Sequence, residues 1–359
     1  MDSLIKIPIG NGSRTCEAHV GPGVIDPVGS TIAEKFARTR CAIISDTNVA
    51  ALFGERVRQN LNVSGFNATV ITVAAGEQSK TLEQAGAICD QMLAAGLDRQ
   101  SFVVGLGGGV IGDLSGFVAA IFERGIPHVQ IPTTLLAMVD SSVGGKTGVN
   151  TSAGKNLIGA FHPPDLIIDD VDVLKTLPRR EFNQGFAEII KHAVVADAEM
   201  FRVLQDADPN NVDLVSLVRR NIEIKSAIVG KDEFDRTGER ALLNFGHTVG
   251  HAIERAGNYN EFLHGEAISL GIVAACKVSM KKAGLLADQR DAIVDLLRKF
   301  ELPTKLPANF ARKEILDALK FDKKFESGKV RFVITPKIGS AQLSDDVTIE
   351  DIREAVDQL

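Results

Sequence analysis

The chain has 359 residues, of which 45% are hydrophobic and 24% are charged. This balance is typical of a globular protein rather than a disordered one, and the length exceeds that of one ordinary hydrophobic core, so we expect two domains sharing a cleft. The formal net charge of -6 argues against a general nucleic-acid binder, because such proteins neutralise phosphates with a basic surface.

The sequence carries no recognisable signal for secretion or for membrane insertion. Residues 1–10 lack a basic region followed by an apolar run, and no apolar stretch approaches the roughly 18 residues of a membrane span. The cysteines are scattered without a Cys-x-x-Cys pair, which favours buried thiols over a zinc or redox motif. These patterns predict a cytoplasmic protein that binds neither membrane nor nucleic acid.

Strand-like and helix-like patterns alternate in the first half of the chain. Apolar residues recur at helical spacing over 81–95, and Gly96 ends that run. The alternation predicts a Rossmann-like, doubly wound α/β domain over residues 1–178. Its buried parallel strands are expected in the short β-rich runs 41–44, 68–73, 102–106 and 129–131.

Long helical periods dominate after Pro178, and strand-like runs become rare until 330–334. The helical periods cover 185–195, 212–229 and 265–283. This pattern predicts a second, mostly α-helical domain over residues 179–359. The segment 165–172 either closes the sheet of the first domain or serves as the linker.

A glycine-rich run, 105–113, follows a predicted strand and precedes the helical pattern 114–121. This order brings backbone N–H groups and the positive end of a helix dipole to a pyrophosphate. The alternative is a tight turn that needs glycine only for positive φ. The run does not match Gly-x-Gly-x-x-Gly cleanly, so the choice stays open.

Polar segments follow the neighbouring predicted strands. Residues 46–48 (Asp-Thr-Asn) and 75–81 lie at carboxyl ends of parallel strands, where open α/β sheets bind ligands. Their carboxylate and amide groups suit ribose hydroxyls and an adenine edge, although Asp46 and Asn48 could equally be ordinary caps. Residues 131–147 and Lys155-Asn156 add hydroxyls, a carboxylate and two lysines in glycine-rich segments, which indicates anion binding.

Histidines and a glutamate fall in three helical segments of the second domain. His247 and His251 lie four residues apart, on one helix face, and His264 opens the next helix. Upstream, Glu188 and Lys191 share another face. Two imidazoles and one carboxylate form a recognised site for catalytic zinc and related metals. The spacing leaves open which histidines bind the metal, and each could instead be a structural, partly buried histidine.

Together these motifs resemble the 3-dehydroquinate synthase family over essentially the whole chain. The resemblance implies bound NAD, a zinc or cobalt ion and a homodimer. It implies that the substrate, 3-deoxy-D-arabino-heptulosonate 7-phosphate, loses phosphate and closes to 3-dehydroquinate in the shikimate pathway, which leads to the aromatic amino acids. The matching segments are 76–78 with Lys80, 107–117, 132–146, 154–156, 175–178, 185–191, 240–251 and 264–266.

The resemblance also implies a role for individual residues. The implied metal ligands are Glu188, His247 and His264, with His251 removing a proton from the reacting hydroxyl. Implied NAD contacts are Asp46, Asn48, Glu77, Gln78, Lys80, Gly109, Val110, Ile111, Gly112, Asp113, Thr133, Thr134, Asp140, Lys146, Lys155, Val173, Leu174, Lys175 and Thr176. Implied substrate contacts are Lys146, Asn156, Lys191, Lys225, Arg240, Asn244 and either Lys323 or Lys324, with Arg124 reaching the site of a neighbouring subunit.

Two features depart from the family pattern. Ala75 stands where many members have Asp, and the stretch from Lys225 to Arg240 is one residue longer than usual. Three alternatives share the scaffold: a sister sugar-phosphate cyclase, a metal-dependent polyol or glycerol dehydrogenase, and a catalytically silent binding protein. Asn244, His251 and the run 240–243 favour the dehydroquinate reaction over a sister cyclase, and the cationic residues argue against a neutral polyol.

Overall fold

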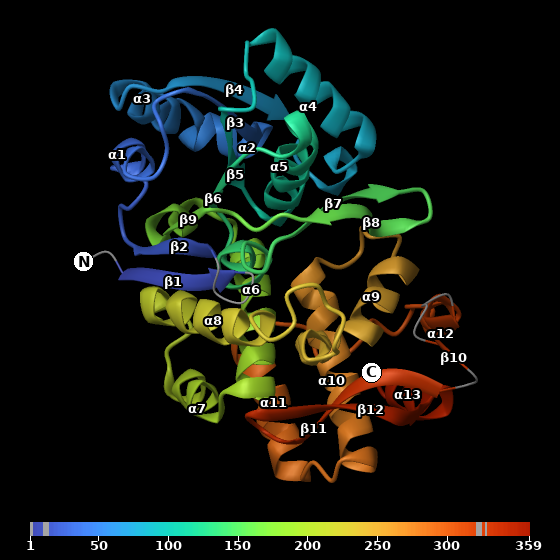
Figure 1. Ribbon diagram of the computed structural model, residues 1–359. Coiled ribbons are helices and arrows are strands. Elements are labelled where there is room, and N and C mark those ends of the chain that lie inside the picture. The colour runs from blue at the N-terminus through green and yellow to red at the C-terminus, as the bar shows by residue number, and fades with distance from the viewer. Residues whose placement is uncertain (1–2, 10–13, 321–324, 327–328) are drawn as a thin grey trace. The chain divides into compact units, whose positions relative to one another are not determined.

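The computed structural model describes residues 3–9, 14–320, 325–326 and 329–359 (Figure 1). The chain divides into two compact units. The first comprises Met1–Leu177 with Leu214–Ser226, and the second comprises Pro178–Asp213 with Ala227–Leu359. The segment Leu214–Ser226, which lies within the span predicted for the helical domain, therefore belongs to the first unit.

The first unit is built on a seven-stranded sheet in the order β1-β2-β9-β6-β5-β3-β4. Only β1 and β2 pair antiparallel; the other neighbours are parallel, as a doubly wound fold requires. Because β9 lies between β2 and β6, the segment 165–172 closes the sheet. The strands are β1 (Ser3–Ile9), β2 (Arg14–Gly21), β3 (Arg40–Asp46), β4 (Asn67–Val73), β5 (Phe102–Gly107), β6 (His128–Pro132) and β9 (Leu166–Asp170).

Helices follow the parallel strands, which confirms the predicted α/β class. Thr81 caps α4 by accepting from Gln84 N at 3.1 Å, and Gly96, with φ of 75°, ends it. The helices of this unit are α1 (Val28–Ala33), α2 (Thr47–Val49), α3 (Glu55–Val63), α4 (Leu82–Ala94), α5 (Gly109–Ile121) and most of α8 (Leu214–Val229). Short turns of 3-10 or π-helix occupy Ala50–Gly54, Glu77–Ser79, Phe122–Arg124, Ala137–Ser141 and Val171–Thr176.

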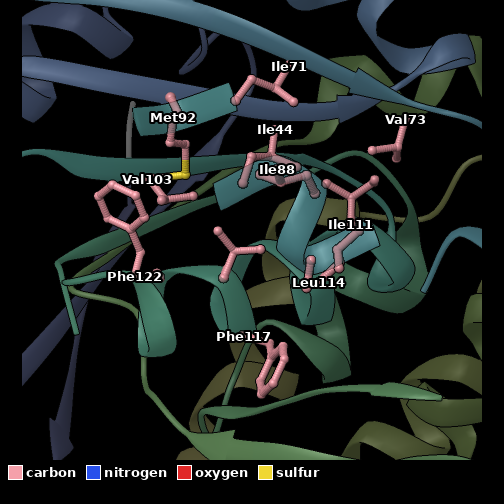
Figure 2. Packing of buried hydrophobic residues seen from close by; sticks show 14 of the residues in the cluster. Ile44, Ile71, Val73, Ile88, Met92, Val103, Ile111, Leu114, Phe117 and Phe122 are labelled. Carbon is pink, nitrogen blue, oxygen red and sulfur yellow. The ribbon is translucent and has the colours of Figure 1, made fainter. Parts of the chain in front are cut away.

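The core of the first unit lies between the sheet and helices α4 and α5 (Figure 2). Ile44 from β3 and Val103 from β5 pack with Ile88 from α4 and Leu114 from α5, and all four are fully buried. Each such side chain stabilises the fold by about 1.5–3 kcal/mol relative to an exposed one. This packing fixes the strand ends from which the polar segments emerge.

Glycines in 105–112 serve close packing rather than positive φ. A β-carbon on Gly105 would lie 2.1 Å from Ser115 Oγ, and one on Gly107 would lie 2.7 Å from Ile111 Cβ, so α5 approaches β5 more closely than side chains would allow. None of the glycines 105, 107, 108, 109 and 112 has positive φ. The alternative of a tight turn that needs positive φ is therefore excluded at these positions.

The polar segment after β6 ends in a hairpin rather than in loop alone. Strands β7 (Lys146–Thr151) and β8 (Gly154–Phe161) pair antiparallel, and Asn156 has a φ of 57°. Lys146 begins β7 and Lys155 lies in β8. The glycine content of this region suggested a loop, but Gly148 and Gly159 pair across the hairpin, where a β-carbon would meet backbone oxygen at 2.7 Å and 2.2 Å respectively.

The second unit is mostly helical, as predicted. Its helices are α6 (Arg179–Ala196), α7 (Ala198–Asp206), α9 (His247–Ala256), α10 (His264–Lys282), α11 (Ala287–Lys299), α12 (Arg312–Lys320) and α13 (Ile349–Asp357), with a 3-10 turn at Arg240–Asn244. Strands β10 (Phe325–Glu326), β11 (Lys329–Lys337) and β12 (Ser340–Thr348) form a small antiparallel sheet. The apolar run 330–334 predicts β11, whereas the polar sequence of β12 gives no such signal.

Glycines bring α9 and α10 into close contact. A β-carbon on Gly271 of α10 would lie 2.0 Å from Gly246 O and 2.8 Å from Gly250 N, both backbone atoms. Gly246 itself has a φ of 81° and precedes the first residue of α9. The two helix axes can approach this closely only because these positions carry no side chain.

A single buried carboxylate orders the segment before Arg240. Asp232 accepts hydrogen bonds from the backbone N–H groups of Arg236 at 2.7 Å, Thr237 at 3.1 Å, Gly238 at 2.9 Å and Arg240 at 3.3 Å. Burial alone raises the pKa of Asp232, but these four donors outweigh it and hold the pKa well below its usual range. The carboxylate therefore fixes the backbone that leads to Arg240 and Asn244.

Among the described residues, no helix is both long and apolar enough to cross a bilayer.

The close contact of α9 with α10 makes Gly271→Ala a test of the packing. The added methyl group would meet backbone that cannot rotate away, so we expect the free energy of unfolding to fall by about 3 kcal/mol, the upper end of usual overpacking costs. Gly86→Ala is the matched control, because a β-carbon there meets nothing within 4 Å and removes a helix-interior glycine. That variant should gain about 0.5–1 kcal/mol in urea titrations. Equal stability of the two variants would contradict the packing argument.

The Asp232 cluster predicts a pH-dependent contribution to stability. A carboxyl whose folded pKa is depressed stabilises the fold above its unfolded pKa of about 3.9, and this contribution is lost as pH falls through the folded value. Asp232→Asn should therefore lower the free energy of unfolding most at pH 7 and progressively less below about pH 4. Urea titrations of both proteins at pH 7 and pH 3.5 measure this; a difference that stays constant with pH would argue against the ionised carboxylate as the ordering group.

Candidate functional site

Three potential metal ligands meet in the second unit, each from a different helix. Glu188 lies on α6, His247 is the first residue of α9, and His264 is the first residue of α10. The Nε2 atoms of His247 and His264 both lie 3.5 Å from Glu188 Oε1. One ligand atom from each of the three residues falls within 4.8 Å of the others. The structure thus brings together the three residues that the family resemblance implied as ligands.

The start of α10 is held against α6 by a glycine and two polar contacts. A β-carbon on Gly265 would lie 2.1 Å from Gln184 O, and Gly265 N donates to Gln184 Oε1 at 3.1 Å. Glu266 accepts from Leu263 N at 2.8 Å and pairs with Arg180 of α6. Because Gln184 and Glu188 are one turn apart on α6, this docking sets His264 beside Glu188.

The carboxylate of Glu188 is fully buried among charged and polarisable groups. Lys191, one turn along α6 and almost fully buried, forms an ion pair with Glu188. Burial lowers the pKa of His247 well below its usual range, and the charge of Lys191 adds to this against the opposing charge of Glu188. Burial also lowers the pKa of His264, but hydrogen bonds with Glu188 and Glu254 outweigh it and raise that pKa.

The second ring nitrogen of each of these two histidines has an acceptor beside it. His247 Nδ1 lies 3.3 Å from the carbonyl oxygen of Phe245, and His264 Nδ1 lies 3.3 Å from Glu254 Oε2. Because a carbonyl or carboxylate oxygen can only accept, Nδ1 of each neutral ring carries the proton and Nε2 presents its lone pair to a metal. Two imidazoles and one carboxylate fit zinc or cobalt and leave coordination positions for substrate.

A second group of potential ligands shares His264. His251, Glu254 and His264 also offer ligand atoms within 4.8 Å of one another. His251 is exposed, and its ring centroid lies 5.2 Å from that of His247 and 6.0 Å from that of His264. The contact of His264 with Glu254 uses Nδ1, whereas its contact with Glu188 uses Nε2, so the two groups place a metal on opposite edges of one ring.

In the first unit, the predicted dinucleotide residues gather at the carboxyl edge of the sheet. Asp46 ends β3, residues 74–81 follow β4, Gly108 follows β5, and Thr133 follows β6; these strands are parallel neighbours. Gly108 provides no side-chain cap to α5, whose first turn contains Gly109, Val110, Ile111 and Gly112. A helix N-terminus without a side-chain cap is an arrangement that suits an anion, which remains a prediction for α5.

Asp46 has a clear structural role at this edge. Its Oδ1 accepts from Asn48 N at 2.9 Å and from Val49 N at 3.1 Å, so it caps α2. The sequence left open whether Asp46 caps a helix or binds ribose. The structure shows that Asp46 caps α2, and its second carboxylate oxygen, Oδ2, takes part in neither of these two hydrogen bonds.

Polar pairs tie the remaining candidates of the first unit together. Lys80 and Asp113, both largely buried, form an ion pair, and Asn150 Nδ2 donates to Glu77 Oε1 at 2.7 Å. Asn150 also donates from its backbone to Lys80 O at 2.8 Å and accepts from Asn156 N at 3.0 Å. Asn150 thus links three predicted segments, although a single Asn in a strand gives no sequence signal for this.

Lys225 lies at the predicted anion segment rather than in the helical unit. Its Nζ is 2.9 Å from Asp140 Oδ1 and donates to Asp140 O at 2.6 Å. Burial raises the pKa of Asp113, while the charge and hydrogen bond of Lys80 oppose that rise and Lys225 opposes it more weakly. Beyond α8, Asp232 orders the segment that leads to Arg240.

The other predicted residues occupy varied environments. Arg240 is buried and donates to Glu233 O at 3.1 Å, and Asn244 ends the 3-10 turn before α9. Arg124 is exposed at the end of a short turn after α5, with φ of 68°. Among the remaining predicted NAD contacts, Val173 and Leu174 are buried, whereas Gln78, Lys175 and Thr176 are exposed. Thr134 is half-buried. Lys323 and Lys324 lie outside the described residues.

The whole chain aligns with proteins of one enzyme family. Residues 70–184 match the family model described as 3-dehydroquinate synthase N-terminal, and residues 185–325 match its C-terminal counterpart. A 3-dehydroquinate synthase from Caulobacter vibrioides is 44% identical over 354 residues, which cover 95% of each chain. One from Nostoc sp. is 42% identical over 368 residues, which cover 100% of each chain.

Solved structures of related cyclases share the fold. A 2-deoxy-scyllo-inosose synthase complexed with carbaglucose-6-phosphate, NAD+ and Co2+ superimposes with a TM-score of 0.91 at 25% identity, covering 99% of this chain and 100% of the other. The 2-epi-5-epi-valiolone synthase from Streptomyces hygroscopicus subsp. jinggangensis, with NAD+ and Zn2+ bound, gives 0.87 at 29% identity and 96% coverage of each chain. Sequence identity is therefore higher toward the synthases that form dehydroquinate than toward these sister cyclases. The chain belongs to the 3-dehydroquinate synthase family.

Proposed function

We propose that the protein converts 3-deoxy-D-arabino-heptulosonate 7-phosphate to 3-dehydroquinate and phosphate. The reaction would pass through transient oxidation, phosphate elimination, re-reduction and intramolecular aldol closure. The observation that carries this proposal is the group Glu188, His247 and His264 on a chain that belongs to the 3-dehydroquinate synthase family. The product would enter the shikimate pathway toward aromatic amino acids.

The metal and NAD would be held by different units. The metal would be bound by Glu188, His247 and His264, whose two imidazoles and one carboxylate suit zinc or cobalt. The pyrophosphate of NAD would bind at the N-terminus of α5, with Lys80, Asp113 and the other polar residues at the sheet edge contacting the nucleosides. When bound, the metal supplies a Lewis acid and NAD accepts and returns a hydride.

The side chains of the protein would position the substrate and move one proton. Lys146, Asn156, Lys191, Lys225, Arg240 and Asn244 would bind the phosphate, carboxylate and hydroxyl groups of the substrate through charge-assisted hydrogen bonds. His251 would remove the proton of the reacting hydroxyl. His251 is exposed, and its ring centroid lies 5.2 Å from that of His247. Both observations support a role in which His251 reaches the substrate beside the metal without binding the metal itself.

Three observations favour this reaction, one over each of the alternatives. Identity above 40% to dehydroquinate synthases, against 25–29% to the solved sister cyclases, argues against a sister reaction. A polyol dehydrogenase binds a neutral substrate and has no use for buried Lys191 and Arg240. A silent binding protein has no use for the histidine and glutamate group.

A homodimer is part of the proposal. Strand β8 exposes Leu157 (56%), Ile158 (38%) and Phe161 (41%) on a two-stranded sheet, which is an apolar surface suited to a second copy. Arg124, also exposed, would extend toward the substrate of the neighbouring subunit.

The stoichiometry of NAD tests the reaction. Purified protein given the heptulosonate phosphate, a catalytic amount of NAD and zinc should release phosphate without net accumulation of NADH. A steady rise in NADH would instead indicate a dehydrogenase. Glu188→Ala, which removes the carboxylate of the metal site, should abolish phosphate release, and retained activity in that variant would rule out the proposed metal site.

His251→Ala tests the proton-transfer role. The variant should keep wild-type affinity for NAD and metal while kcat falls by about a hundredfold, the usual scale of general acid–base catalysis. Turnover measured with saturating substrate, together with metal content after dialysis, separates the two effects. An unchanged kcat rejects the role, and loss of the metal would make His251 a ligand instead.

A further inference from the structure

We propose that Glu254 is a positioning residue for the metal: it accepts the Nδ1–H of His264 and so fixes that ring with Nε2 toward Glu188. The inference rests on the proposed metal site but not on the identity of the substrate. No sequence motif pointed to Glu254. It emerges from the way α9 and α10 pack.

The helix geometry puts Glu254 within reach of His264. Glu254 follows His247 by two helical turns on α9, so the two side chains lie on the same face of that helix. The glycine contacts at Gly250 and Gly271 bring this face against α10. Glu254 Oε2 then lies 3.3 Å from Nδ1 of His264, the first residue of α10.

The burial of Glu254 makes this hydrogen bond energetically significant. Its side chain is 4% exposed, and a buried carboxylate is costly unless hydrogen bonds or opposite charge compensate it. His264 supplies a donor at this position. In return, the carboxylate restricts rotation of the imidazole and increases the electron density on Nε2, which strengthens binding to a metal.

The same contact explains how one histidine can be shared by two candidate ligand groups. A metal bound by Glu188, His247 and His264 uses Nε2 of His264 and leaves Glu254 as its hydrogen-bond acceptor. A metal bound by His251, Glu254 and His264 would use the Nδ1 edge and displace that hydrogen bond. His247 Nδ1 has a backbone acceptor in Phe245 O, so both ligand histidines follow one pattern in the first group. The fully buried Glu188 supplies the negative charge there.

Direct metal titration of the full-length protein tests the inference without any substrate. Apo-protein is titrated with Co2+ in competition with a chelator, and the Co2+ absorption spectrum is followed. Glu254→Ala should weaken Co2+ binding by about 10–100-fold, the usual effect of removing such an acceptor. Glu254→Gln keeps an oxygen acceptor but loses the charge, so it should recover part of the lost affinity.

Control variants make the outcome decisive. Glu261→Gln removes a carboxylate from the exposed segment between α9 and α10 and should leave Co2+ affinity unchanged. NAD affinity, measured in parallel, should be the same in every variant because the first unit is untouched. Co2+ affinity of Glu254→Ala within twofold of wild type would overturn the proposal.

Two further variants distinguish a positioning role from direct ligation. Glu188→Ala should abolish Co2+ binding, and His251→Ala should leave it intact. The opposite result, in which Glu254→Ala and His251→Ala abolish binding while Glu188→Ala retains it, would make Glu254 a ligand and also overturn the proposal. Because these titrations contain no sugar phosphate, a failure to form dehydroquinate would contradict the proposed function and leave this result standing.

Discussion

The site in the second unit depends on one fully buried carboxylate, that of Glu188. An isolated ionised carboxylate in such a position would be strongly unfavourable, so the protein must surround it with compensating groups. Lys191 supplies a positive charge one turn away, and His247 and His264 present Nε2 atoms at 3.5 Å. With both imidazoles neutral, the same three side chains would offer a divalent cation one carboxylate and two ring nitrogens.

The positions of these side chains also depend on close packing of the helices that carry them. The three ligand atoms can converge only if α6, α9 and α10 approach closely near their residues 188, 247 and 264. Gly265 contacts Gln184 of α6, and Gly271 contacts Gly246 before α9, in both cases against backbone that a side chain would displace. By allowing this close packing, the glycines set the positions of the three side chains, although they contribute no potential ligand atom themselves.

Three of the lysines that the family resemblance implies in contact with NAD or substrate are paired with carboxylates. Lys80 contacts Asp113, Lys191 contacts Glu188, and Lys225 contacts Asp140. Such pairing lowers the cost of burying each charge and orients the ammonium groups.

The sequence by itself determined the α/β class, the helical character of the second half and the residue types that could bind a metal. Strand and helix periodicity and short motifs are local properties, so they do not depend on the tertiary structure. Spacing and periodicity could not decide which histidines approach Glu188, that Lys225 lies beside Asp140, or that Asp46 caps a helix. Nor did they indicate Glu254, Asp232 or Asn150. These contacts join residues through packing and hydrogen bonds that no periodicity encodes, so only the tertiary structure could supply them.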